Sequence, residues 1–137
     1  MLYTGVIYMN NNWEVCPRDE TNGRWAALYA TLNPGGDIVI SRFTHEAMGR
    51  PEAYLLMFDR TNSVIGLRGA KASLDKNAYP ARSRGRHGGR VIRGFRLCSE
   101  FGIWVNETVK FPRAKIDGDG VLILDLRQIQ TAARQRV

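Results

Sequence analysis

The chain has 137 residues, of which 44% are apolar and 24% are charged, and its formal net charge at neutral pH is +7. This composition is that of one globular domain, and it excludes disorder, collagen and a disulfide scaffold as descriptions of the whole chain. Because no apolar run approaches the ~20 residues of a membrane span and the first residues lack the pattern of a secretory leader, we expect a cytoplasmic protein that does not bind membranes.

The first half of the chain begins with polar residues that favour turns. We therefore expect residues 1–24 to be irregular. The apolar stretch 25–32 predicts a strand, and the Asn-Pro-Gly-Gly sequence at 33–36 predicts a tight turn before a second strand at 37–40.

A short helix is expected next, over residues 42–48. Ser41 is a favourable N-cap, and Gly49 is a favourable left-handed C-cap. The apolar run 53–58 then predicts a buried strand, and 64–68 predicts its hairpin partner.

The second half repeats this succession after a basic stretch. The sequence predicts a strand, one helical turn and two further strands, over 90–95, 97–101, 107–111 and 121–126, with a loop at 112–120. The Asp-Gly-Asp-Gly sequence at 117–120 predicts a hairpin turn rather than a calcium loop. Residues 127–137 are expected to form a helix or a tail.

An offset of 53 residues aligns the two halves without a gap. It places Gly35 and Gly36 on Gly88 and Gly89, and it places Gly49 on Gly102. We therefore expect one domain made of two related units, 28–69 and 88–126, joined by a basic linker at 70–87. Since neither unit can bury both faces of its strands alone, the units are expected to pack about a pseudo-two-fold axis.

The residues from Leu32 to Gly49 carry a family resemblance. Their strand end, Gly turn, apolar strand and short helix ending in Glu-Ala-Met-Gly resemble the swapped-hairpin β-barrel of the AbrB and MazE DNA-binding proteins, with a closer likeness to the two-unit MraZ regulators. The resemblance implies a β-rich α+β fold, in which two tandem units with short helices form a small barrel. It also implies a role in transcription regulation.

The DNA-contact motif of that family differs in this chain. The family places Asp before the first turn and Arg after it, whereas this sequence has Asn33 and Asp37. The aligned positions of the second unit are Arg86 and Arg90. The resemblance therefore implies that the second turn, rather than the first, contacts nucleic acid.

The excess positive charge is concentrated in one segment. Residues 68–96 hold nine basic residues and one acidic residue, whereas the remaining chain holds 11 basic and 12 acidic residues. A local field of this kind attracts polyanions, and arginine grips phosphate with two hydrogen bonds. Tyr79, at the entrance to the arginine run, is expected to stack on a base or on an arginine. The expected partner is nucleic acid, with DNA as the first candidate. The residues expected to contact its phosphates are Arg82, Arg84, Arg86, Arg90, Arg93 and Arg96.

Catalysis is not expected. His45 is interpreted as a packed helical residue and Cys98 as a buried, inert thiol. The spacing of the cysteines and histidines does not form a zinc site, and there is no phosphate-binding loop, dinucleotide fingerprint or nucleophile elbow. The sequence thus predicts a protein that is not an enzyme and has no metal or cofactor.

The alternative is a protein-interaction module, such as an antitoxin-like or assembly partner. In that case the basic segment would dock on an acidic protein and would bind no nucleic acid. A solvated loop with surplus arginine is the third interpretation of the same charge pattern. The sequence leaves a homo-oligomer open.

Overall fold

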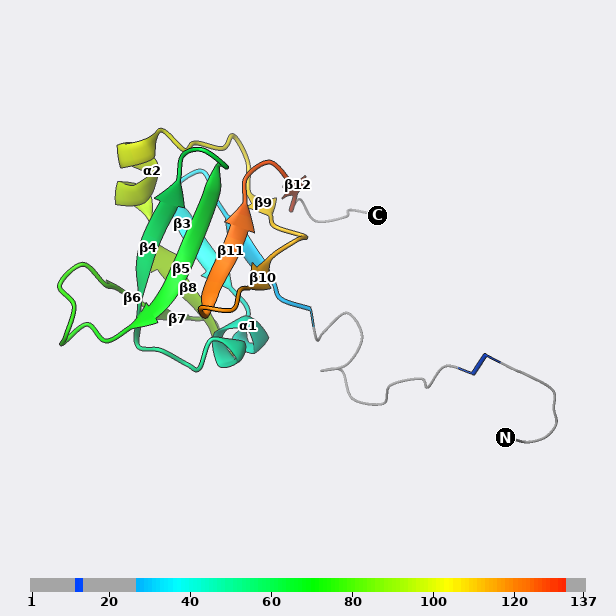
Figure 1. The fold of residues 1–137 in the computed structure, drawn as a ribbon, viewed down its shortest axis with the longest axis horizontal. Coiled ribbons are helices and arrows are strands. Elements are labelled where there is room, and N and C mark those ends of the chain that lie inside the picture. The colour runs from blue at the N-terminus through cyan, green and yellow to red at the C-terminus, as the bar shows by residue number, and fades with distance from the viewer. Residues whose placement is uncertain (1–11, 14–26, 133–137) are drawn as a thin grey trace.

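A computed structural model describes residues 12–13 and 27–132 (Figure 1). The segment 1–24, expected to be irregular, lies outside the described residues apart from positions 12 and 13, and so does Cys16.

Two antiparallel sheets make up most of the described chain. The first sheet contains β4 (Ala53–Asp59), β5 (Val64–Ala70), β6 (Tyr79–Pro80), β10 (Lys115–Ile116) and β11 (Val121–Asp125), in the order β10-β11-β5-β4-β6. The second sheet contains β2 (Ala30–Leu32), β3 (Asp37–Ile40), β7 (Arg82–Arg84), β8 (Gly89–Arg93), β9 (Val109–Lys110) and β12 (Gln130–Thr131), in the order β12-β9-β2-β3-β8-β7. The expected β-rich α+β class is confirmed.

The hydrophobic core lies between the two sheets, which face each other in Figure 1. Alternate residues of each strand point inward, because successive side chains of a strand lie on opposite faces. In the second sheet, Ile38 pairs with Ile92, and both are fully buried. In the first sheet, Leu67 and Leu122 pair in the same way and are also fully buried.

The described residues form two short helices, α1 (Arg42–Ala47) and α2 (Phe95–Phe101). The Ser41 hydroxyl accepts a hydrogen bond from the backbone N–H of Thr44 at 3.1 Å, which confirms the predicted N-cap. Gly49 and Gly102 have φ of 89° and 67°, so both take the left-handed conformation expected of a glycine that ends a helix. Among the described residues, no helix is long and apolar enough to cross a membrane.

The strand order has a mirrored pattern. The pair β3 and β8 and the pair β5 and β11 each join matching strands of the two halves in antiparallel fashion. Outside these pairs lie β2 and β7 in one sheet, and β4 and β10 in the other. The offset of 53 residues places β4 on residues 106–112, which contain β9, whereas the next strand, β10, lies in the other sheet.

Several predicted boundaries are wrong. The strand predicted at 90–95 ends at Arg93, because Phe95 begins α2. The basic linker 70–87 contains β6 and β7, and the predicted loop 112–120 contains β10. These strands are two or three residues long and have no apolar run. The sequence pattern therefore does not predict them, and each is a strand because it pairs with a neighbouring strand.

The described part of the C-terminal segment is not helical. Residues 127–132 form a turn and then β12, which pairs with β9. The turn predicted at 117–120 is confirmed. The Asp117 carboxylate accepts hydrogen bonds from the backbone N–H groups of Asp119 and Val121, at 2.9 and 3.0 Å, between β10 and β11.

Candidate nucleic-acid interface

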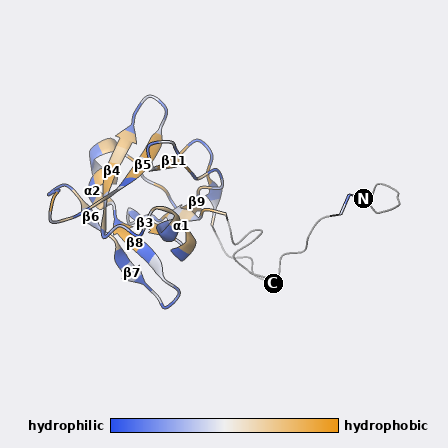
Figure 2. Cartoon of the chain, turned by 60° about the horizontal axis from the view of Figure 1, so that its bottom comes forward, coloured by the Kyte–Doolittle hydropathy of each residue, from blue (hydrophilic) through white to orange (hydrophobic). Residues whose placement is uncertain are grey.

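The densest basic segment is a β-hairpin at the edge of the second sheet. Arg82 pairs with Val91 and Arg84 pairs with Gly89, and the connecting loop spans residues 85–88. The hairpin extends away from the body of the described chain and is largely hydrophilic (Figure 2). The structure holds this segment in a ladder of paired strands, so its side chains have defined faces.

Three of the predicted arginines lie on the outer face of this hairpin. In the strand pairing, Arg82 lies directly opposite Val91. Arg84 is two residues after Arg82 on β7, and Arg93 is two residues after Val91 on β8. Because side chains alternate along a strand, all three point to the face opposite the core-facing Ile92. All three arginines are exposed.

Arg90 points to the other face of the hairpin, together with Ile92. It is half-buried, and its Nη1 donates hydrogen bonds to the carbonyls of Gly88 and Gly89, both at 3.0 Å. Part of its guanidinium therefore holds the hairpin loop in place.

The remaining predicted contacts are spread over three elements. Arg86 is exposed in the hairpin loop, and Arg96 is exposed in the first turn of α2. Tyr79 lies on the edge strand β6, is half-buried and packs against the core. Tyr79 and Arg96 line the same hollow, together with Glu100.

None of these six arginines has a carboxylate within ion-pair distance in the part of the chain that the structure describes. The ion pairs there join Arg42 to Glu46 at 3.0 Å, Arg50 to Glu46 at 3.8 Å and Arg127 to Asp125 at 3.3 Å. Residues 79–99 contain six arginines and no acidic residue. Asp37 is paired with Arg93 in the strand register and Glu100 lines the same hollow as Arg96, so two of the six arginines have an acidic residue nearby, although neither forms an ion pair among the described residues.

Sequence reasoning missed one neighbour of the hairpin, Arg42 of α1. A Cβ atom placed on Gly88 would lie 2.7 Å from Cδ of Arg42, so this side chain crosses the hairpin loop where glycine leaves room. The contact joins residues far apart in the sequence. The only sign of this contact in the sequence is the glycine itself, Gly88, in the turn of the second unit.

His45 lies on the inner side of α1 and is buried against β4. Its Nδ1 lies 2.8 Å from the hydroxyl of Tyr54, and both side chains are buried. This confirms the interpretation of His45 as a packed residue. Burial lowers the pKa of His45, and the guanidinium groups of Arg90 and Arg50 lower it further.

This lowered pKa predicts a loss of stability in mild acid. As the pH falls below 6.5, the ordinary pKa of histidine, His45 becomes protonated in the unfolded chain but stays neutral in the folded chain. Until the folded pKa is reached, this one group lowers the free energy of unfolding by up to about 1.4 kcal/mol per pH unit. Urea unfolding at pH 7 and at mildly acidic pH measures the effect.

The matched variants are His45→Gln and His87→Gln. Glutamine at 45 keeps a hydrogen-bonding group beside Tyr54 but does not titrate, so the pH dependence should flatten. His87→Gln is the control, because it removes the other histidine of the chain from an exposed position in the hairpin loop. Equal pH dependence in the wild type and in His45→Gln would contradict the assignment.

Cys98 is also buried as predicted, and burial raises the pKa of its thiol. This disfavours the reactive thiolate. Among the described residues, no group of three histidines, cysteines or acidic residues is placed to hold a metal ion.

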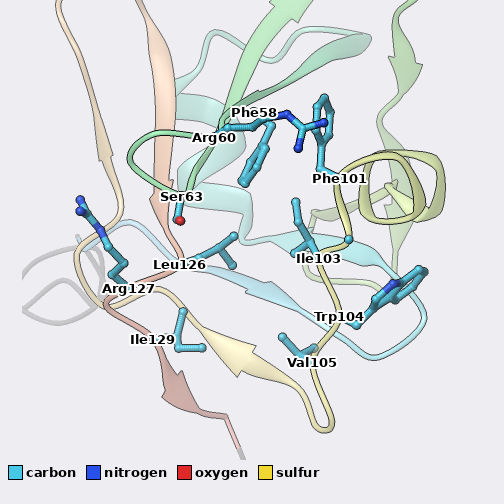
Figure 3. A pocket seen from close by; sticks show the side chains of 11 residues that line it. Phe58, Arg60, Ser63, Phe101, Ile103, Trp104, Val105, Leu126, Arg127 and Ile129 are labelled. Carbon is cyan, nitrogen blue, oxygen red and sulfur yellow. The ribbon is translucent and has the colours of Figure 1, made fainter.

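A larger hollow of about 490 Å³ lies beside the end of α2 (Figure 3). Phe58, Ile103 and Leu126 face one another across it, and Arg60, Ser63 and Arg127 add polar groups to its walls. Arg60 lies over the ring of Phe101, 4.9 Å from its centre. The lining has no acid–base pair and no cysteine, so the hollow does not present a catalytic set.

Comparisons of the chain with models of protein families, with curated proteins and with solved structures found no match.

Proposed function

We propose that this protein is a small, cytoplasmic nucleic-acid-binding protein, similar to a transcription regulator, that grips the phosphates of DNA through the β7–β8 hairpin. Arg82, Arg84 and Arg93 contact phosphates from its outer face, Arg86 from its loop and Arg96 from the adjacent helix. Arg90 positions the loop and presents its remaining N–H groups. Tyr79 supplies a ring for stacking beside Arg96.

One observation carries this proposal: a protruding hairpin with exposed arginines and no carboxylate partner within the described residues. Like charges repel, so a cluster of this kind costs stability unless an anion neutralises it. The planar guanidinium binds phosphate, as it binds carboxylate, through two parallel hydrogen bonds.

The mirrored strand order supports a tandem pair of swapped-hairpin units of the AbrB and MraZ type. Each unit gives one hairpin to each sheet, and matching strands meet as antiparallel neighbours. Gly36 of the first turn contacts Phe95 at the start of α2, while Gly88 of the second turn contacts Arg42 at the start of α1. Arg42 and Phe95 are 53 residues apart and Gly36 and Gly88 are 52 apart, so the two contacts correspond to within one residue of the offset, which supports a pseudo-two-fold axis.

Salt dependence tests the proposal. Each neutralised phosphate of duplex DNA releases counterions and adds about −0.9 to the slope of log affinity against log salt. With four to six arginines engaged, we expect a slope of about −4 to −5, measured by fluorescence anisotropy of a labelled duplex between about 50 and 200 mM salt. A flat response, or no binding at the lowest salt, would overturn the proposal.

The second candidate is an interaction module for an acidic protein. It is favoured by the position of β7, which pairs with β8 and forms the edge of its sheet, so that its other backbone edge has no strand partner among the described residues. An extended acidic segment can add to such an edge. Purification with an acidic protein, together with no nucleic acid absorbance, would favour this function over the first.

A further inference from the structure

The side of the β7–β8 hairpin that faces α1 carries a second group of cations. Arg42 crosses the hairpin loop at Gly88, where a Cβ atom would lie 2.7 Å from its Cδ. The helix and the hairpin lie side by side in both views (Figures 1 and 2). A basic side chain of α1 therefore extends the surface of the hairpin.

Arg50, just after α1, belongs to the same group. The Glu46 carboxylate of α1 pairs with both Arg42 and Arg50, so the two guanidinium groups lie together beside α1. The side chains of Arg42 and Arg50 are 68% and 73% exposed. Within the described residues, Glu46 is the one acid bonded to them, and its Oε2 lies 3.0 Å from Arg42 and 3.8 Å from Arg50.

The hairpin thus has cations on both of its faces. Arg82, Arg84 and Arg93 lie on the outer face, whereas Arg42 and Arg50 lie on the side of α1. A single strand presents one row of phosphates, but a duplex presents two rows with a groove between them. The major groove is wide enough to admit a two-stranded β-ribbon.

We infer that the β7–β8 hairpin enters the major groove of duplex DNA, and that Arg42 and Arg50 contact the phosphate row on the side opposite to Arg82 and Arg84. This inference rests on the proposed function and specifies its substrate as the duplex. Glu46 weakens the second contact, because its carboxylate competes with phosphate for both guanidinium groups.

The experiment compares matched double variants, each of which removes two positive charges. Arg82→Gln/Arg84→Gln removes the outer face, and Arg42→Gln/Arg50→Gln removes the face beside α1. Arg113→Gln/Lys115→Gln is the control, because both residues are exposed around the start of β10 in the other sheet. Anisotropy is measured with a labelled duplex and with one of its strands, and circular dichroism checks that each variant is folded.

On the duplex, both face variants should bind about tenfold more weakly or worse, and each should make the salt slope less steep by about 1.8, while the control binds like the wild type. A single strand presents only one row of phosphates, so only one of the two face variants should weaken its binding. Glu46→Gln should bind the duplex more tightly than the wild type and with a steeper salt slope.

Each contrary result has a separate meaning. If the wild type binds the duplex and only the outer-face variant weakens it, or if Glu46→Gln has no effect, the two-row arrangement is wrong and the proposed function stands. If the wild type binds the single strand as well as the duplex, and both face variants weaken both to the same degree, the groove assignment is wrong. If the wild type binds neither, the proposed function fails first.

Discussion

The Arg82→Glu/Arg84→Glu variant is expected to lose duplex binding by roughly a thousandfold at about 100 mM salt. The two substitutions change the charge of one face of the hairpin by four units, and the new carboxylates repel the phosphates that the arginines attract. Both positions are exposed on β7, so the melting temperature should stay close to that of the wild type. Anisotropy and thermal unfolding measure the two quantities on the same samples.

A control variant separates local contact from the effect of total charge. Arg113→Glu/Lys115→Glu makes the same change of four units on the other sheet. If binding depends on the hairpin, this control should weaken it far less than the hairpin variant does. Equal losses in both variants would mean that net charge alone, and not the hairpin, attracts the nucleic acid.

The Gly36→Ala variant is expected to lower the free energy of unfolding by about 2–4 kcal/mol. Gly36 has a φ of 88°, and an added Cβ would lie 2.9 Å from Cα of Phe95 and 3.1 Å from its backbone nitrogen. Backbone atoms cannot move aside as a flexible side chain can. The carbonyl of Gly36 also accepts a hydrogen bond from the N–H of Gly94 at 2.9 Å, so a shift would break a contact between the two halves.

Gly49→Ala is the matched control for this variant. Gly49 has nearly the same φ, 89°, but a Cβ there would meet nothing within 4 Å. It should therefore lose only the conformational cost of alanine in the left-handed region, about 1 kcal/mol. Urea unfolding gives both values, and equal losses at the two positions would show that the contact between Gly36 and Phe95 does not contribute.

The parts of the fold that follow from the sequence are those set by local chemistry. β4, β5 and β11 are apolar runs, and the ends of α1 follow from Ser41 and Gly49. The missed strands depend on a partner instead. β7 has the sequence Arg-Ser-Arg, which has no strand signal of its own, and it is a strand because β8 offers it an unpaired edge. The same reason explains β12 beside β9.

The candidate site divides in a similar way. The charge count along the chain located the arginines, but it could not assign faces, because the faces depend on the register of β7 and β8. It treated Arg90 like the others, although the hydrogen bonds of Arg90 to Gly88 and Gly89 give it a positioning role. It also omitted Arg42, which reaches the hairpin only through folding.

The division between β9 and β10 has a mechanical consequence. After β9 pairs with β2, the chain turns at residues 111–114, where the N–H of Phe111 bonds to the carbonyl of Ala30, and it then joins β11 in the opposite sheet. This connection joins the two sheets covalently. A force that slides one sheet over the other must first break the backbone hydrogen bonds of β9 or of β10, so the sheets resist shear more strongly than side-chain packing alone would allow.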